Sequence, residues 1–379
     1  MPLPSQLNVD IINPVTNTKL TVNDVEISQP IVGTGTAPFR NTIIGTGAGA
    51  SLTTGPNSGS GTMNVVLGTD AMRLNQWGYA NVVIGEKAYE LSDGGIGNTV
   101  VGSTALNSAI PFGTNANSFQ TAIGYQALYN FTTGMAPDPL YPLLVGSSNV
   151  AVGTSSGISL ITGVNNTFVG SGSSANINSG KGNVAVGTDF STSLIAVGDY
   201  NTFLGQAAGY NFNGGNSNTY LGAKPWALLL TPVAETGNNN ILVGFDVFKA
   251  TPSASNSITL GNSSNNVLRC AVTSITSLSD SRDKEDIKDL STGLDFVKTL
   301  RPVEFTWKDR DENGKQGIAD FGFIAQDLKK SQEDAEKAEV LKLVYDENPE
   351  KLEASYGKLI PILVKAIQEL TAKVEQLEK

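Results

Sequence analysis

A serine and a lysine five positions apart are the residues in this sequence whose types and spacing best suit chemistry. Ser279 and Lys284 lie in SDSRDKEDI (279–287), with Asp280 and Arg282 beside them. The chain contains no histidine, which excludes Ser-His-Asp and Cys-His catalysis. The serine must then be activated by another base, and a lysine serves when burial or nearby cations favour its neutral form. This stretch is therefore either a solvated linker or a reaction site.

Composition narrows the remaining classes of function. The absence of histidine also excludes histidine-ligated metal sites, and we expect no metal ion and no cofactor. Cys270 is the single cysteine, so it forms no disulfide within the chain, and we expect a small buried side chain. A net charge of −10 without a basic tract argues against nucleic-acid binding. The apolar runs fall short of the ~18 residues of a membrane span, and MPLPSQLNVD lacks the features of a secretion signal.

The charge density rises sharply at residue 279. Residues 1–278 hold 8 Lys/Arg and 12 Asp/Glu, a net charge of −4, whereas residues 279–379 hold 17 and 23, a net charge of −6. A break of this kind marks a domain boundary. We therefore expect a repeat domain over 33–278 and a second domain over 279–379. Residues 1–32 alternate apolar and polar positions, which predicts short strands, in a segment that either attaches the protein or caps the repeats.

One five-residue pattern recurs through residues 41–261: asparagine, a β-branched residue, a variable residue, Val/Ile/Leu and glycine. The closing glycines are most often 17 residues apart, and the larger gaps of 22, 23 and 29 correspond to insertions. A fixed period of this size predicts a solenoid whose coils stack on one another. A glycine-rich β-sandwich is the alternative. The copies are NTIIG (41–45), NVVLG (64–68), NVVIG (81–85), NTVVG (98–102), QTAIG (120–124), NVAVG (149–153), NTFVG (166–170), NVAVG (183–187), NTFLG (201–205), NTYLG (218–222), NILVG (240–244) and SITLG (257–261).

The pattern itself suggests how each coil is built. The second and fourth residues share one face of a strand, and because both are β-branched or aliphatic, we expect them to line a dry interior. The middle residue then points to solvent or to a neighbouring chain. The glycine permits a tight turn with positive φ, and the asparagine can close a turn through its side chain.

These repeats resemble the left-handed parallel β-roll heads of trimeric autotransporter adhesins, whose signature is a V-A-I-G run beside an asparagine. NVAVG at 149–153 and 183–187 is the most similar, and QTAIGYQAL (120–128) is similar to repeats of phage fibre and adhesin-like sequences. Here the asparagine directly precedes the β-branched residue and the unit is longer. The resemblance implies a mainly β fold, a trimeric parallel β-roll or solenoid of about 17-residue repeats.

The sequence after residue 279 predicts a small α+β domain. STGLDFVKTL (291–300) has helical spacing, PVEFTWK (302–308) alternates as a strand, and FGFIAQ (321–326) predicts a second strand that leads into a charged helix. Asp311-Glu312-Asn313-Gly314 is a turn signal. The C-terminal residues predict a heptad seam, hence a coiled coil over about 356–379, with an amphipathic helix packed on its own domain as the alternative. The seam is Tyr356, Ile360, Leu363, Ile367, Leu370, Val374 and Leu377.

Four ordered blocks of this region resemble the C-terminal intramolecular chaperone domain of phage tail fibres, tailspikes and endosialidases. They are SDSRDKEDI (279–287), LRPVEFTWKD (300–309), GFIAQDL (322–328) and LIPILVKAIQELTAKVEQLE (359–378). The resemblance implies a domain that trimerises the chain, templates folding of the upstream β-structure and then cleaves itself off. The implied cut lies between Leu278 and Ser279.

The resemblance also implies roles for single residues. The family's Ser/Lys pair corresponds to Ser279 and Lys284, with Arg282 and Asp280 as supporting residues. Asp283 stands where the family tends to have an apolar residue, and its carboxylate would favour the charged form of the lysine and slow the reaction. The enzyme activity would be limited to one self-cleavage, without an external substrate.

The expected function is that of a trimeric viral tail fibre or appendage protein, located in the virion after synthesis in the host cytoplasm. Its expected partners are two further copies, other tail proteins through the N-terminus, and a glycan or protein receptor on the host surface; no membrane insertion is expected. A bacterial surface adhesin and a glycan-degrading tailspike are the alternatives. Aromatic residues that could contact a receptor, although core or inter-chain packing is favoured, are Trp77, Tyr79, Tyr125, Tyr210, Tyr220 and Trp226.

Overall fold

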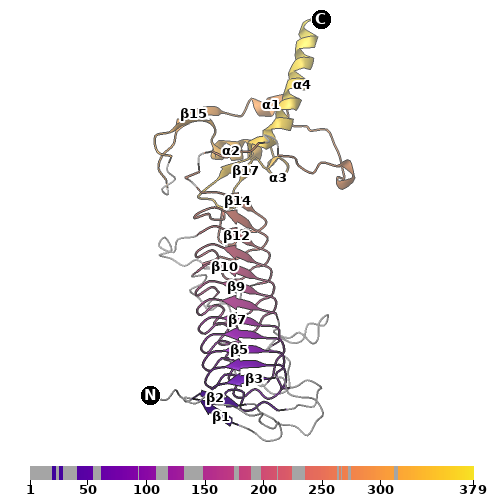
Figure 1. Ribbon diagram of the computed structural model, residues 1–379. Coiled ribbons are helices and arrows are strands. Elements are labelled where there is room, and N and C mark those ends of the chain that lie inside the picture. The colour runs from indigo at the N-terminus through magenta and orange to yellow at the C-terminus, as the bar shows by residue number, and fades with distance from the viewer. Residues whose placement is uncertain are drawn as a thin grey trace. The chain divides into compact units, whose positions relative to one another are not determined.

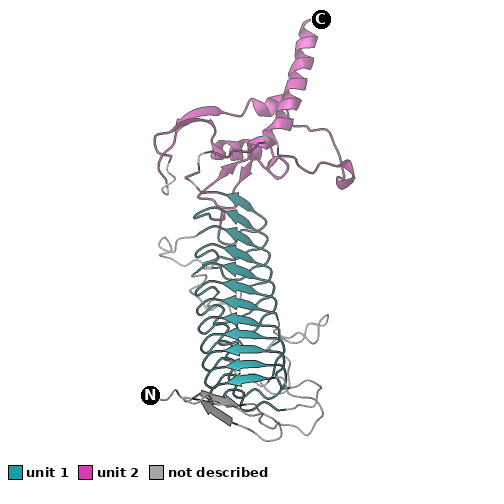
Figure 2. Cartoon of the chain, in the orientation of Figure 1, with its two compact units in different colours: residues 1–247, 252–260 teal, residues 248–251, 261–379 magenta. Residues whose placement is uncertain are grey.

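The computed structural model divides the 379-residue chain into two compact units (Figure 2). The first comprises Met1–Val247 and Pro252–Leu260, and the second comprises Phe248–Thr251 and Gly261–Lys379. The predicted boundary at 278/279 thus falls within the second unit. The structure describes residues 19–22, 25–28, 41–53, 61–92, 94–107, 118–131, 148–174, 179–188, 198–210, 212–223, 235–262, 264–265, 267–271, 275–310 and 315–379.

The described part of the first unit is a stack of coils, each of which contributes one three-residue strand (Figure 1). Within these residues, twelve strands, β3 to β14, pair in parallel and in sequence order, and β1 and β2 add to the β3 end as antiparallel strands. The predicted parallel solenoid is thereby confirmed at the level of a parallel sheet. The strands are β1 (Lys19–Val22), β2 (Val25–Ser28), β3 (Thr42–Ile44), β4 (Val65–Leu67), β5 (Val82–Ile84), β6 (Thr99–Val101), β7 (Thr121–Ile123), β8 (Val150–Val152), β9 (Thr167–Val169), β10 (Val184–Val186), β11 (Thr202–Leu204), β12 (Thr219–Leu221), β13 (Ile241–Val243) and β14 (Ile258–Leu260).

The faces of these strands are the reverse of those that we predicted. In β10 the middle residue Ala185 is buried, whereas Val184 and Val186 on either side stay partly exposed. Alternation fixes which residues share a face but not which face is the inner one, and here both faces are largely apolar. The wrong assignment followed from treating the β-branched positions as the core. The buried middle residues are Ile43, Val66, Val83, Val100, Ala122, Ala151, Phe168, Ala185, Phe203, Tyr220 and Leu242.

The motif asparagines are buried and form a ladder along the stack, instead of only closing a turn. The Oδ1 atom of Asn166 accepts the backbone N–H of Asn183 at 2.9 Å and its side-chain amide at 3.2 Å. The Nδ2 atom of Asn166 donates to the Gly180 carbonyl at 2.9 Å and to Oδ1 of Asn149 at 3.1 Å. Each buried amide is thus satisfied by the adjacent coils, as buried polar groups require. Gln120 takes the place of asparagine in this ladder, since its Oε1 accepts the backbone N–H of Asn149.

The closing glycines leave no room for a side chain. Gly85 has a φ of +136°, and a Cβ atom added there would lie 2.5 Å from the carbonyl oxygen of Gly102 in the next coil. Gly68 and Gly102 meet the same obstruction from the coil that follows each of them. The predicted turn with positive φ is therefore confirmed, and the tight stacking explains why the glycine recurs in every coil.

The second unit packs short elements around a small apolar core. Its central buried residues are Phe296, Leu341, Leu343, Leu359 and Ile362. The predicted strands and the helix after them are confirmed, whereas the turn predicted at 311–314 lies outside the described residues. The elements are η2 (Ser281–Asp283), α1 (Leu294–Val297), β15 (Pro302–Thr306), β16 (Ala319–Phe323), α2 (Ala325–Asp334), α3 (Ala338–Leu341), β17 (Val344–Tyr345), β18 (Glu353–Ala354), η3 (Tyr356–Lys358) and α4 (Leu359–Leu377).

Helix α4 presents two apolar surfaces. Leu359, Ile362 and Ala366 are buried on one face, and the first two belong to the core of the unit. The adjacent face carries the apolar residues of the predicted heptad, which we call the α4 seam and list below. Their side chains are 43% to 86% exposed. A helix packed on its own unit and a free heptad seam are thus both present. Among the described helices, none has the length and apolar character needed to cross a bilayer. The α4 seam consists of Ile360, Leu363, Ile367, Leu370, Val374 and Leu377.

Candidate active site

The structure brings together the two side chains that the sequence singled out. The Nζ atom of Lys284 donates a hydrogen bond to Oγ of Ser279 at 2.6 Å and a longer one to the Ser279 carbonyl oxygen at 3.3 Å. This contact is short enough for direct proton transfer between the two side chains. When the lysine is neutral, the same contact lets it accept the hydroxyl proton, as a Ser/Lys pair requires.

A single 3-10 turn, η2, brings the lysine back to the serine. Asp280 begins this turn, since its Oδ1 accepts the backbone N–H of Arg282 at 2.9 Å. The turn closes when the backbone N–H of Lys284 donates to the Ser281 carbonyl. Lys284 then continues in extended conformation. An aspartate before a turn satisfies the free N–H groups there, so Asp280 holds the backbone that separates the reacting residues.

Arg282 completes this arrangement by an ion pair with Asp280. Its Nη2 atom lies 2.6 Å from Oδ2 of Asp280, and its Nε contacts both carboxylate oxygens. Hydrogen bonds from the guanidinium and from the backbone N–H of Arg282 hold the pKa of the Asp280 carboxyl below its ordinary value. The same carboxylate raises the pKa of Arg282. The structure therefore gives both residues a positioning role, without a contact to the Ser279 hydroxyl.

The scissile position that the resemblance implies is fully accessible. Leu278 is 99% exposed, and residues 275–289 are all exposed in the single chain. An exposed peptide bond suits cleavage. The single chain therefore brings the two side chains together beside an accessible bond.

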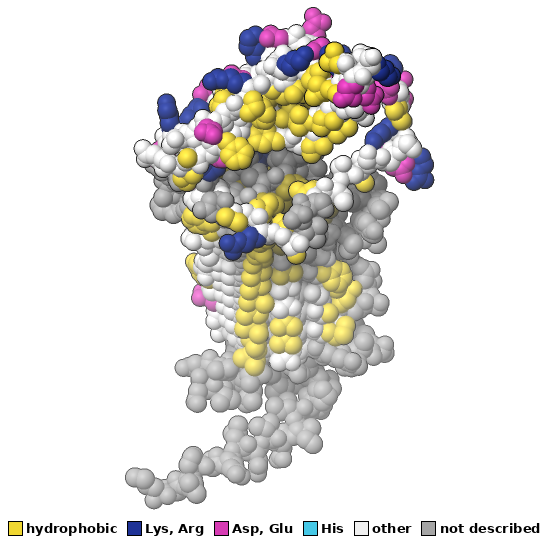
Figure 3. Space-filling model, turned by 90° about the horizontal axis from the view of Figure 1, so that it is seen from above, with side chains coloured by type: hydrophobic (Ala, Val, Ile, Leu, Met, Phe, Trp, Pro, Cys, Tyr) yellow, Lys and Arg dark blue, Asp and Glu magenta, His cyan; other side chains and the backbone are white. Residues whose placement is uncertain are grey.

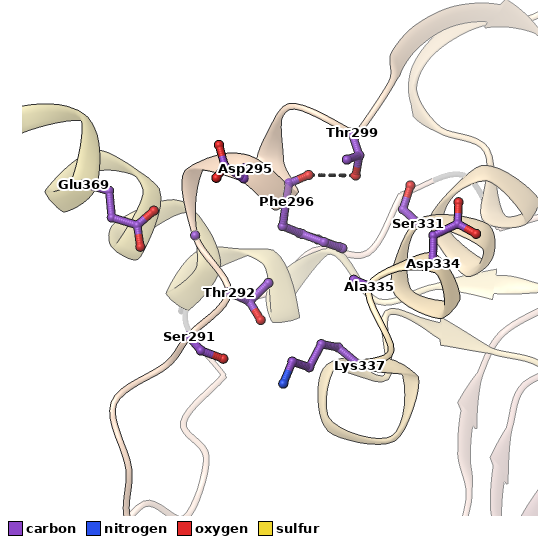
Figure 4. Close-up of a pocket in the computed structure, with 11 residues that line it drawn as sticks. Ser291, Thr292, Asp295, Phe296, Thr299, Ser331, Asp334, Ala335, Lys337 and Glu369 are labelled. Atoms are coloured by element: carbon purple, nitrogen blue, oxygen red, sulfur yellow. Dashed lines mark hydrogen bonds between the residues drawn. The ribbon is translucent and has the colours of Figure 1, made fainter. Parts of the chain in front are cut away.

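A separate hollow in the second unit lies among α1, α2 and α4 (Figure 4). The carboxylate of Glu369, on α4, accepts the backbone N–H of Leu294 at 2.7 Å. A Cβ atom at Gly293 would meet this carboxylate. Glu369 thus caps the first turn of α1 across 75 residues, a structural contact that no sequence signal indicated. The residues that line this hollow are Ser291, Thr292, Gly293, Asp295, Phe296, Thr299, Ser331, Asp334, Ala335, Lys337 and Glu369.

The structure corrects the expectation for Cys270 and confirms the core packing that was favoured for Tyr220. Cys270 is exposed, so the predicted buried role is wrong; the surrounding residues 267–271 are all exposed as well. Tyr220 is buried, with its ring against Phe203 and Phe212, and burial beside Glu235 raises the pKa of its hydroxyl.

The other aromatic side chains considered for receptor contact differ in exposure. Tyr125 is 52% exposed. Trp77, Tyr79 and Tyr210 are half-buried, and Trp226 lies outside the described residues. Of the described members of this set, Tyr125 thus presents the most surface to a partner.

Comparison with known proteins places the serine–lysine turn at the start of a family match. Residues 279–336 match the peptidase S74 family, described as chaperone of endosialidase. The match covers η2, α1, β15, β16 and α2. No curated protein and no solved structure gives a significant match to the chain. The C-terminal part of the chain therefore carries a domain similar to the chaperone of endosialidase.

Proposed function

We propose that this chain is a trimeric viral tail fibre or appendage protein whose residues 279–379 direct assembly and are then released by self-cleavage between Leu278 and Ser279. The observation that carries the proposal is the family match, which begins at Ser279, the residue whose hydroxyl contacts Lys284. Residues 1–278, which include the repeat unit, remain after cleavage. The repeat unit binds a host surface in this proposal, and the N-terminal segment attaches it to the virion.

The α4 seam supports the trimeric state. Ile360 is 63% and Ile367 is 64% exposed, although both are large apolar side chains on a regular helix. Apolar residues at alternating spacings of three and four are typical of coiled coils, in which copies of the helix bury the seam against one another. If this helix holds three copies together, their repeat units begin to fold from a common end and at a raised local concentration.

The proposed chemistry uses Ser279 and Lys284 alone as reacting side chains. Neutral Lys284 accepts the proton of Ser279 Oγ as this oxygen attacks the carbonyl carbon of Leu278. The bond from that carbon to the Ser279 nitrogen breaks, and the proton passes from the lysine to the departing amine. Water then hydrolyses the Leu278 ester. In the alternative route, the pair activates a water molecule that attacks the same carbonyl carbon directly.

Assembly controls this chemistry in the proposal. Both reacting residues are exposed in the single chain, whereas a serine that is activated by a lysine needs a desolvated site. Burial of the turn against neighbouring copies would supply such a site. Cleavage would then follow trimer formation, and the loss of the clamp would trap the folded fibre kinetically.

The buried acids of the repeat unit support binding over glycan hydrolysis. Glu90 receives hydrogen bonds from Arg73, the shorter of which is 2.5 Å, and Glu235 accepts the hydroxyl of Tyr220 at 3.2 Å. Both carboxylates are thus engaged in contacts between or within coils. A glycosidase instead needs two carboxyl groups that flank a sugar.

Ser279→Ala is the decisive test of self-cleavage. On a denaturing gel, the wild-type protein should give fragments of 278 and 101 residues, because the serine supplies the attacking oxygen. Ser279→Ala should remain full length, as should Lys284→Arg, which keeps the charge but cannot become neutral. Ser281→Ala is the matched control, since this exposed serine of the same turn supplies only backbone contacts, and it should cleave normally. An intact wild-type chain, or cleavage of Ser279→Ala, would refute the assignment.

A further inference from the structure

The reversed faces of the repeat strands leave a long apolar surface on the outside of the sheet. We call the first and third residues of strands β3 to β14 the outer columns. Every residue of the outer columns is Val, Ile, Leu or Thr, and none in these described strands is charged. Leu204 and Leu221, in register on neighbouring strands, are 42% and 44% exposed, and Ile258 reaches 68%.

The outer columns are too extensive for an ordinary free surface. Twelve strands about 4.8 Å apart make each column about 50 Å long, and the two columns lie about 7 Å apart. Single apolar residues on a surface are normal, but a continuous patch of several hundred Å² marks an interaction site. Figure 3 shows hydrophobic side chains gathered in columns along the stack of coils.

The periodicity of the outer columns points to a second copy of the same chain as the partner. Copies related by an axis parallel to the stack present the same strand at the same height, so their columns match rung for rung. A different protein would need its own series of strands at the same spacing. The exposed α4 seam of the same chain independently indicates self-association.

We propose that the outer columns form the contact between the repeat units of three copies, with the sheets facing a common axis parallel to the stack. This inference rests on the proposed trimer and adds the surface through which the repeat units meet. The buried middle residues of each strand hold the coil together, and the outer columns hold the coils of different copies together.

This interface gives the C-terminal clamp a specific task. The strands differ little from one another on the outside: β8 and β10 both present two valines, and β11 and β12 both present a threonine and a leucine. A shift of one copy by a whole coil would therefore keep most apolar contacts. Register must then be fixed from elsewhere, and in-register helices at the C-terminus fix it before the columns meet.

The first test measures the accessibility of a single thiol in the assembled protein. Cys270, which is exposed, is changed to serine, and a new cysteine is introduced as Leu204→Cys or, as a control, Asn213→Cys. Asn213 is exposed and follows Phe212, whose ring crosses the core to contact Phe203 of β11. Asn213 therefore lies on the side of the coil away from the sheet. Reaction of both thiols with a maleimide is followed by mass spectrometry, and sedimentation gives the oligomeric state of the same samples.

The expected result is a slower reaction at Leu204→Cys, by more than about tenfold, because a buried thiol reacts only when the interface opens. Both thiols should react equally in denaturant. Equal rates in a protein that sediments as a trimer would overturn the inference and leave the proposed trimer intact. Sedimentation as a single chain would instead refute the proposed function, and the inference with it.

A charge variant provides a second test that does not depend on thiol chemistry. Leu204→Lys with Leu221→Lys places two cations in one outer column, whereas Asn130→Lys with Asn213→Lys adds the same charge to exposed residues outside the strands. The first variant should lose the soluble trimeric repeat fragment, whether it dissociates or precipitates, since buried unpaired charges are costly. The second should keep it. A soluble trimer of unchanged mass from the first variant would contradict the proposed interface.

Discussion

The repeat unit and the C-terminal unit distribute their polar groups in opposite ways. The repeat unit buries a continuous ladder of amides, in which Asn183 and its neighbours bond from coil to coil. The C-terminal unit buries a small apolar core and leaves the contact between Ser279 and Lys284 at the surface. The first arrangement is complete only when many coils are present. The second is locally complete in geometry, and in the proposed function its chemistry begins only when assembly buries the turn.

This difference indicates which unit folds first in the proposed function. Each coil depends on the next for its hydrogen bonds, and the outer columns expose apolar surface until copies meet. Such a structure has no self-sufficient nucleus of its own, and it is slow to form and prone to aggregate. The C-terminal unit is small and has its own core. In the proposed function it therefore folds early, gathers the copies and starts the stack at one end.

Removal of residues 279–379 should have the largest effect of the changes considered, because it tests whether the repeat unit can fold without the C-terminal part. Expression of residues 1–278 alone should give largely insoluble protein, because the outer columns would be exposed without a clamp to bring copies together. The fraction of soluble protein, compared with the uncut Ser279→Ala chain at equal expression, is the measurement. If residues 1–278 assemble readily into soluble trimers, the repeat unit needs no template and the proposed order of folding is wrong.

Charges on the α4 seam test whether assembly activates the reactive turn. Ile367→Glu with Leu370→Glu should abolish the trimer and slow self-cleavage by about a hundredfold, the usual scale for loss of general base catalysis. Gln368→Glu, at an exposed position of the same helix, is the control and should cleave like the wild type. Sedimentation and a gel time course after cell-free synthesis follow both effects. Rapid cleavage in a monomeric seam variant would show that the single chain suffices.

A pair of glycine substitutions compares a position that both the adjacent coil and the backbone conformation restrict with one that only the backbone conformation restricts. Gly85→Ala should destabilise the repeat unit by about 3 kcal/mol or more, because its Cβ would collide with the backbone of the next coil. Gly172 also has a positive φ, of +64°, but this value lies in the αL region that L residues can adopt, and the space around an added Cβ is open. Gly172→Ala should therefore cost only about 1 kcal/mol. Thermal unfolding of the two trimers compares these costs. Equal losses would mean that stacking between coils contributes little.

Much of this organisation was predictable because local sequence patterns determine it. The N-β-x-aliphatic-G motif predicted the strands and their order, and the resemblance of the 279–287 block to a known family predicted the pairing of Ser279 with Lys284. The inner face was not predictable, since Val184 and Ala185 are both apolar and alternation does not say which side is inside. The partners of the asparagines lie in adjacent coils, and Glu369 caps α1 across 75 residues. Contacts of this kind depend on tertiary packing that no local pattern records.

The smallest expected effect concerns Asp280, which positions the reactive turn. Its pKa is lowered by Arg282, so the ionised carboxylate favours the turn above the ordinary carboxyl range, and this contribution is lost as the pH falls through the lowered value. Asp280→Asn keeps an oxygen for the cap but loses the ion pair. It should slow cleavage near neutral pH by about twofold to fivefold, as expected for an exposed pair, and it should remove the acid-side decline that this carboxyl causes. A cleavage time course over a pH series tests both points. If Asp280→Asn abolished cleavage altogether, the residue would take part in the reaction itself, and the contrast between a passive turn and a reactive serine–lysine pair would have to be redrawn.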